Sequence, residues 1–270
     1  MNPVSDAYRA NMALWNEWTD INSRSSLYAL DAFKAGRSKL HPLEVEELGP
    51  VAGKSLLHLQ CHFGMDTLSW ARLGAAATGV DFSDRAIALA QQLSQECSVP
   101  ARFVLSDIYA LPDHLDETFD IVYTSYGVLP WLSDLGAWAR VAARFLRPGG
   151  TFYMVEFHPF SNIYNEGDPE LLIESPYFKT GATVWPVQGS YADRQAVVHQ
   201  DISYEWTHPL GEVLSALLAA GIRLEFVHEF PFSVYPQFTF LEKGTDGYYY
   251  LPGKATTLPL MYSIKGYLNC

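Results

Sequence analysis

At 270 residues, the chain is long enough for one large α/β domain, or for one domain with a substantial insertion, and its 49% hydrophobic content argues against disorder. The 18 basic and 30 acidic residues give a net charge of −12, and the basic residues are scattered, which disfavours a nucleic-acid partner because such a partner calls for a basic face. The sequence has no run of 18 apolar residues, and its first 15 residues lack a basic region followed by an apolar block, so we expect no membrane span, no secretory signal and a cytoplasmic protein.

The first 50 residues are predicted to contain two helices. Tyr8, Met12 and Trp15 recur at helical spacing on one face. A second, short helix is predicted after Ser26, whose hydroxyl can cap it.

Residues 54–83, KSLLHLQCHFGMDTLSWARLGAAATGVDFS, have the pattern of a strand, a tight loop, a helix and a second strand. Gly64 supplies backbone freedom in the loop, and Asp66 is expected to cap the helix. Asp81 ends the second strand about 20 residues after the loop, where a nucleotide-binding βαβ unit places the acid that holds the ribose hydroxyls.

Two further strands follow. Ser83 is expected to cap a helix over residues 84–94, and residues 101–105 form the third strand. Residues 118–125 form the fourth strand, and the loop YGVLPW lies beyond its carboxyl end, which is the edge of an open α/β sheet where ligands bind. This topology makes three residues candidates for a pocket: Ser125, Tyr126 and Trp131.

The motif LRPGG at residues 146–150 ends a helix over residues 135–145 and turns the chain into the fifth strand, residues 151–157. His158 then stands at the carboxyl end of a central strand, and its ordinary pKa suits a general base. The alternative is a histidine that hydrogen-bonds a loop carbonyl.

The region after the fifth strand changes character. Residues 161–199 are rich in Tyr, Trp, Pro and Gly and are predicted to be an insertion, followed by a strand over residues 196–206. Pro209 is expected at the first position of the next helix, and His208 or Glu205 before it could reach a substrate or serve as a helix cap. The last predicted strand spans residues 262–267.

Other kinds of site are disfavoured. His58, Cys61 and His62 straddle a strand-to-loop break and do not provide the three or four converging ligands of a metal site, so we predict no metal. Cys61, Cys97 and Cys270 are isolated and fit reduced thiols in the cytosol. The sequence has neither the nucleophile elbow of an α/β-hydrolase nor a P-loop.

The stretch HLQCHFGMDTLSWARLG, the GVDFS that follows it and the complete LRPGG resemble motifs of class I S-adenosylmethionine (SAM)-dependent methyltransferases, and within them an uncharacterised bacterial subgroup. The resemblance covers about Leu56 to Phe230. The sequence departs from the usual glycine-rich motif at three positions. His58 stands in place of the usual acid, and Gln60 and His62 stand in place of two glycines, whereas Gly64 is kept.

The resemblance implies a doubly wound, seven-stranded, mostly parallel Rossmann-like α/β sheet whose last strand is antiparallel. The whole chain is then one methyltransferase domain. Its parts are an N-terminal helical lid (1–50), a SAM-binding core (51–160), an insertion after strand five that covers the substrate (161–205) and the C-terminal part of the core (206–270).

The expected site residues follow from the motifs together with the resemblance. Asp107 with Ile108 matches the family's adenine contact, and lid residues such as Trp15, Tyr28 or Arg37 are expected near SAM or the substrate, unless they serve only packing or a solvated turn. The residues predicted to bind SAM are Gln60, His62, Gly64, Asp81, Phe82, Asp107, Ile108, Ser125 and Trp15. The residues predicted to bind substrate are Tyr126, Trp131, Tyr177, Trp185 and Tyr191, with Phe178 in the same aromatic wall.

The expected function is methyl transfer from SAM to a small-molecule acceptor, in which the protein holds donor and acceptor in line. His158 is the first candidate for a general base and His208 the second. The alternatives are a non-catalytic protein of the same fold that binds SAM or S-adenosylhomocysteine (SAH), and a NAD-type oxidoreductase. SAM is preferred over NAD because it has no phosphate, so the bulky Gln60 and His62 are easier to accommodate.

Overall fold

The computed structural model describes residues 3–253 and 257–269, so that Cys270 lies outside the described part. Within that part, Cys61 and Cys97 are free thiols. None of the described helices is long and apolar enough to cross a membrane.

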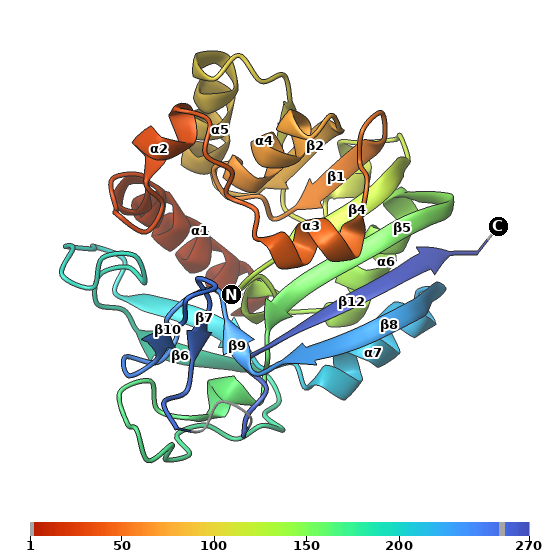
Figure 1. Ribbon diagram of the computed structural model, residues 1–270. Coiled ribbons are helices and arrows are strands. Elements are labelled where there is room, and N and C mark those ends of the chain that lie inside the picture. Colours follow the sequence, from red (N-terminus) through yellow and green to blue (C-terminus); the bar gives the residue numbers. More distant parts are fainter. Residues whose placement is uncertain (1–2, 254–256, 270) are drawn as a thin grey trace.

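A seven-stranded sheet forms the centre of the molecule, in the order β3-β2-β1-β4-β5-β12-β8 (Figure 1). The first five strands in this order pair in parallel, and β12 pairs antiparallel with both β5 and β8. This is the predicted methyltransferase-type sheet, and the prediction is confirmed. Its strands are β1 (Ser55–Leu59), β2 (Ala76–Asp81), β3 (Arg102–Leu105), β4 (Phe119–Ser125), β5 (Leu146–Phe157), β8 (Ile222–Phe230) and β12 (Met261–Leu268).

Helices cover both faces of this sheet, because its inner strands are apolar at successive positions. In β5, for example, Phe152 packs in one core cluster with α6 and α7, and its neighbour Tyr153 packs on the opposite face with α3 and α4. The helices are α1 (Pro3–Asn22), α2 (Leu30–Lys34), α3 (Pro42–Leu48), α4 (Met65–Arg72), α5 (Asp84–Glu96), α6 (Leu135–Phe145) and α7 (Leu210–Ala219).

Short strands outside the large sheet gather at one end of it, on the same side as α1 (Figure 1). Strands β6 (Ala182–Pro186) and β7 (Ile202–Trp206) form an antiparallel pair within the predicted insertion. Three short strands that lie between β8 and β12 in the sequence form a second small sheet: β9 (Phe232–Ser233), β10 (Glu242–Lys243) and β11 (Tyr249–Tyr250). The sequence analysis did not predict this sheet. Single 3₁₀ turns lie at Leu111–Asp113, Leu129–Trp131 and Ser161–Ile163.

Several predicted boundaries were wrong. Asp66 does not cap α4; Gly64 in the left-handed conformation precedes the helix, and Asp66 lies in its first turn. The strand predicted over residues 196–206 is confined to β7, because residues 196–201 are a loop held by turns and by α1. Pro209 precedes α7 as its N-cap and is not its first residue, whereas Ser83 caps α5 as predicted.

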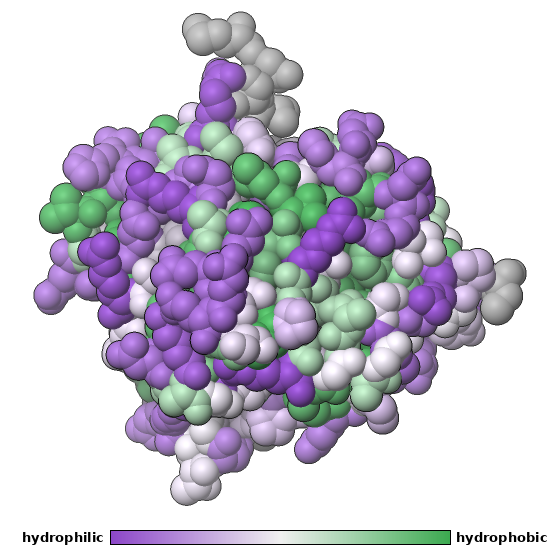
Figure 2. Space-filling view, turned by 90° about the horizontal axis from the view of Figure 1, so that it is seen from above, coloured by the Kyte–Doolittle hydropathy of each residue, from purple (hydrophilic) through white to green (hydrophobic). Residues whose placement is uncertain are grey.

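One face of the molecule is mainly hydrophilic (Figure 2). Figure 2 shows one face of the molecule, where hydrophilic residues predominate and hydrophobic residues form smaller patches between them.

Candidate functional site

A cavity of about 970 Å³ lies at the carboxyl ends of β1, β2, β3 and β4. Its floor consists of the loops that follow these strands, and α1 and the insertion line it from the opposite side. In an open α/β sheet this edge is where ligands bind, because the loops after parallel strands diverge there and leave a crevice.

The loop after β1 is strained at two of its residues. Gln60 and His62 have φ values of 57° and 50°, in the left-handed region that non-glycine residues rarely adopt. Gly64 also has a positive φ, of 75°, and a Cβ atom there would lie 2.5 Å from the ring of Phe103. This contact explains physically why Gly64 is the glycine that is kept, since the other two positions have room for side chains.

Asp81 at the end of β2 is fixed by backbone donors. One carboxylate oxygen accepts from the backbone N–H of His62 at 2.7 Å, and the other accepts from that of Ser83 at 2.9 Å. Burial raises the pKa of Asp81 to about 6, against the lowering effect of these hydrogen bonds. Asp107, after β3, similarly accepts from the backbone N–H of Tyr109 at 2.7 Å, and burial raises its pKa.

The position that usually carries an acid is occupied by an uncharged histidine. His58 contacts Thr67 through Nδ1 at 2.9 Å and Ser125 through Nε2 at 3.4 Å. Burial lowers the pKa of His58 to about 3, so its ring is neutral at physiological pH. A carboxylate is present nearby, because Ser125 Oγ also lies 3.4 Å from Asp66, which lines the cavity.

A basic residue that the sequence analysis missed also lines the first cavity. Lys39 lines the cavity, donates to the carbonyl of Leu27 at 3.2 Å and stands 5.0 Å from the centre of the Tyr28 ring. His41 also lines the cavity, and burial lowers its pKa to about 4. Both residues come from the segment between α2 and α3, whose sequence has no motif that would have marked them.

Aromatic side chains line the part of the cavity nearest α1. The Trp15 ring lies edge-on to those of Trp18, His62 and Trp131, each with a centroid distance of 5.2 Å. The indole N–H of Trp18 donates to Gly189 in the insertion. The indole N–H of Trp15 is buried and has no partner among the described residues.

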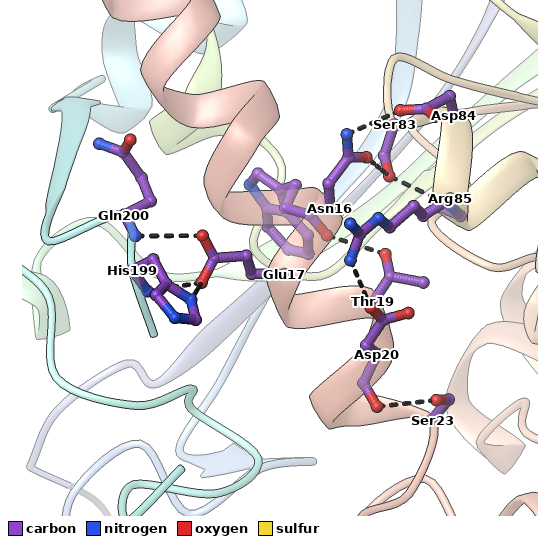
Figure 3. A network of polar contacts seen from close by, with 12 residues as sticks. Asn16, Glu17, Thr19, Asp20, Ser23, Ser83, Asp84, Arg85, His199 and Gln200 are labelled. Atoms are coloured by element: carbon purple, nitrogen blue, oxygen red, sulfur yellow. Dashed lines mark hydrogen bonds and ion pairs between the residues drawn. The ribbon is translucent and has the colours of Figure 1, made fainter. Parts of the chain in front are cut away.

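Polar contacts fasten α1 on two sides (Figure 3). Asn16 donates to Asp84 at 2.7 Å and accepts from the hydroxyl of Ser83, so it joins α1 to the start of α5. On the other side, Glu17 accepts from the backbone N–H groups of His199 and Gln200 in the insertion. Helix α1 therefore connects the loops after the strands to the insertion above them.

A second cavity of about 770 Å³ adjoins the first, and the insertion supplies many of its residues. Both cavities are lined by Trp18, Phe157, Tyr191, Glu205, Tyr235 and Gln237. The carboxylate of Glu205 accepts from the hydroxyl of Ser203 at 2.8 Å, and burial raises its pKa. The shared lining makes the two cavities adjoining compartments of one candidate site.

The structure brings most of the predicted binding residues together. The predicted SAM-binding residues, with Tyr126, Trp131, Tyr191 and Tyr28, all line the first cavity. Trp185 lines the second. Tyr177 lines neither cavity, since its hydroxyl accepts from the backbone N–H of Leu210 at the start of α7; Phe178 is 82% exposed, and Arg37 lies outside both.

The two predicted bases lie outside the first cavity. His158 contacts Glu229 on β8 through Nε2 at 2.9 Å, and its Nδ1 accepts from the backbone N–H of Phe160, so both ring nitrogens are occupied. His208 lines the second cavity and donates through Nε2 to the carbonyl of Leu132 at 2.8 Å. The end of β5 was predicted correctly, but the His158 ring is directed towards β8.

Other cavity residues that the motifs did not mark are Tyr8, Trp18, Asp66, Tyr235 and Gln237. Tyr8 and Trp18 lie on α1 near Trp15, and their helical spacing was a usable signal. Asp66 was noticed only as a cap, and Tyr235 and Gln237 follow β8 in a segment without a recognised motif. Within the described residues, no group of three His, Cys, Asp or Glu side chains could hold a metal ion.

Part of the chain resembles known proteins in sequence. Residues 57–154 match the family model described as a methyltransferase domain. A ubiquinone biosynthesis O-methyltransferase of Albidiferax ferrireducens is 29% identical over 153 residues, which is 55% of this chain and 60% of that protein. Another from Pseudomonas putida is 30% identical over 118 residues and is covered to 50%, so the chain spans about half to three fifths of these curated relatives.

Solved structures share the fold over most of the chain. A SAM-dependent methyltransferase from Mesorhizobium loti superposes with a TM-score of 0.56 at 20% identity, covering 87% of this chain and 99% of that one. The glycopeptide N-methyltransferase MtfA, crystallised with SAM, superposes with a TM-score of 0.54 at 15% identity, covering 83% of this chain and 90% of that one. At these identities the likeness shows the fold.

Proposed function

Because residues 57–154 match the family model described as a methyltransferase domain, we propose that this chain binds SAM and transfers its methyl group to a small-molecule acceptor. The observation that carries the proposal is the first cavity, in which the carboxylates of Asp81 and Asp107 lie at the ends of β2 and β3. Carboxylates at adjacent strand ends suit the ribose hydroxyls and the adenine amine of SAM.

The residues present fit SAM. Three residues that line the first cavity each have a buried polar atom without a partner among the described residues: Trp15 Nε1, Gln60 Oε1 and His62 Nε2. Buried polar groups are normally hydrogen-bonded, so these atoms point to a ligand with polar groups of its own. When bound, SAM supplies an electrophilic methyl group on a positively charged sulfur.

The protein's own part in the reaction is orientation and exclusion of water. The carboxylates of Asp81 and Asp107 hold the nucleoside end, and the tryptophans on α1 cover the cavity. The acceptor occupies the second cavity, where it meets the first at Glu205 and Tyr191. Holding two reactants in line is the main source of catalysis for a displacement of this kind.

Two other functions are weighed against this one. A non-catalytic SAM- or SAH-binding protein is the second candidate, and it is favoured by the position of His158, whose ring nitrogens are both bonded outside the cavity. A NAD-type oxidoreductase is disfavoured by the antiparallel β12 between β5 and β8, because the dinucleotide-binding sheet runs 3-2-1-4-5-6.

The first test is binding. The purified protein is denatured and its extract checked for SAM or SAH, and ligand-free protein is then titrated calorimetrically with SAM, SAH and NADH. We expect SAM and SAH to bind in the micromolar range and NADH to give no signal. If the protein binds NADH but neither SAM nor SAH, the proposal is overturned. If it binds SAM tightly but methylates no compound in a broad acceptor panel, the non-catalytic binding protein is the better description.

We further propose that Glu205 accepts the proton of the acceptor, because it lines both cavities and its partner is the neutral hydroxyl of Ser203. A base acts as its ionised form, and the pKa of Glu205 is raised, so the rate should rise with pH through a value above the ordinary pKa of a glutamate. Glu205→Gln should remove this rise of the rate with pH and lower kcat by about 100-fold or more.

The matched control is Glu212→Gln on the exposed start of α7, which should leave the profile unchanged. If Glu205→Gln retains turnover within about threefold of the parent, the activation free energies differ by less than ~0.7 kcal/mol. Glu205 is then not the base.

A further inference from the structure

His62 lines the first cavity at a position where the motif of the resembled family has glycine, and one of its ring nitrogens is unpaired. Its Nε2 atom is buried and has no hydrogen-bond partner among the described residues. Its Nδ1 atom lies 3.3 Å from the hydroxyl of Tyr28. The direction of that hydrogen bond decides which ring nitrogen carries the proton.

The direction can be traced from the insertion. The backbone N–H of Ala192 donates to Ser190 Oγ at 3.0 Å, so the Ser190 hydroxyl hydrogen is available to donate to Asn22 Oδ1. This bond orients the amide of Asn22, and its Nδ2 group donates to the hydroxyl of Tyr191 at 2.9 Å. The insertion thereby fixes the side chain at the end of α1.

The two tyrosines continue the chain of hydrogen bonds. Tyr191 accepts from Asn22, so its own hydrogen is directed to the hydroxyl of Tyr28, 2.5 Å away. Tyr28 in turn donates to Nδ1 of His62. The opposite direction would leave the hydroxyl hydrogen of Tyr191 without an acceptor in this cluster, which is unfavourable for a buried group.

The ring of His62 is therefore neutral with its proton on Nε2. Burial lowers the pKa of His62 to about 3, so the ring has one proton over the physiological range, and Nδ1 is occupied as an acceptor. The Nε2–H group is then a buried donor, on a residue that lines the cavity, with nothing in the described protein to accept from it.

We propose that His62 Nε2–H donates a hydrogen bond to an oxygen of the bound cofactor, and that Tyr28 and Tyr191 keep the imidazole in the tautomer that allows this. The proposal rests on SAM being the cofactor. The backbone N–H of His62 donates to Asp81, so this residue adjoins the predicted ribose site. The oxygens of SAM are those of its ribose and of its amino-acid carboxylate.

The test compares SAH binding by the parent with that by His62→Phe, which keeps a ring of similar size and removes both nitrogens. We expect the variant to bind SAH about five- to tenfold more weakly, as for the loss of one hydrogen bond. The control is His114→Phe at an exposed position, which should bind SAH as the parent does. 5′-Methylthioadenosine, which lacks the amino-acid part, identifies the oxygen: an equal loss assigns the ribose, and no loss assigns the carboxylate.

A second measurement does not depend on the fold of His62→Phe. In ¹⁵N-labelled parent protein, the imidazole of His62 should show a protonated Nε2 and an unprotonated Nδ1. Tyr28→Phe removes the donor to Nδ1, so this variant should show a mixture of tautomers and weaker SAH binding. Tyr191→Phe should change less, since Tyr28 can still donate to the ring.

The result that overturns the inference is a parent with its proton on Nδ1, or a His62→Phe variant that binds SAH as tightly as the parent. Either result leaves the proposed function intact. If instead the parent binds neither SAM nor SAH, the proposed function itself is wrong.

Discussion

Asp81 is the residue whose protonation state we expect to control cofactor binding. Its pKa is raised to about 6 by burial, and the carboxylate is the form that accepts from ribose hydroxyls. As the pH rises through 6 the carboxylate forms, so the affinity for SAH should increase. Asp81→Asn should bind SAH more weakly at pH 7.5 and show a smaller change between pH 5 and 7.5.

Calorimetric titration at three pH values measures this change. The control is Asp113→Asn, in the 3₁₀ turn Leu111–Asp113 outside both cavities, which should keep the pH dependence of the parent. An SAH affinity that is constant between pH 5 and 7.5 in the parent would show that the ionisation of Asp81 does not matter for binding.

Single residues were also where the sequence predicted least well. Asp81 and Asp107 were identified because they follow strands in a known pattern. The direction of the His158 ring could not be predicted, because it is set by Glu229, a residue of β8 that is distant in the sequence. Lys39 and His41 reach the cavity from a segment without periodicity, and only the folded chain shows them there.

Helix α1 is the element whose attachment can be tested separately from the sheet. Asn16→Ala removes its bonds to Asp84 and Ser83 at the start of α5. We expect a loss of about 1 kcal/mol in the free energy of unfolding, faster amide exchange in α1 and weaker SAH binding, because α1 lines the cavity.

The matched control is Asp20→Asn, which removes the ion pair between Asp20 and Arg85 on the same helix. Both side chains of that pair are 51% exposed, so its loss should change stability by less than about 0.5 kcal/mol. Equal effects of the two substitutions on exchange and binding would mean that the Asn16 contacts do not hold α1 in place.

Helices and strands were predicted well where a strong pattern existed. The strands β1, β2 and β4 are apolar runs, and both of their ends were close to those observed. Strand β5 ends as predicted at Phe157, but it begins at Leu146, inside the motif that was predicted to be a turn. The small sheet of β9, β10 and β11 was missed because each of its strands is two residues long, which is too short for a period to be seen. Strand β7 was predicted too long, because residues 196–201 bond to α1 and to turns and do not pair with another strand.

For the molecule as a unit, the resemblance predicted a seven-stranded, mostly parallel sheet, and the structure confirms it. The site could be predicted only in part, because it combines three distant regions of the chain. These are α1 with the following residues up to 41, the strand-end loops and the segments around the insertion and residue 235. Local patterns fix the second region, whereas the first and third depend on long-range packing.

The three neutral histidines of the first cavity, His41, His58 and His62, have a consequence for product exchange. Since they carry no charge, carboxylates outnumber the cationic groups around a bound ligand. In the proposed reaction the sulfur is positive before transfer and uncharged afterwards. The cavity therefore attracts the incoming methyl donor electrostatically and loses that attraction once the methyl group has left, which favours replacement of spent cofactor by fresh cofactor.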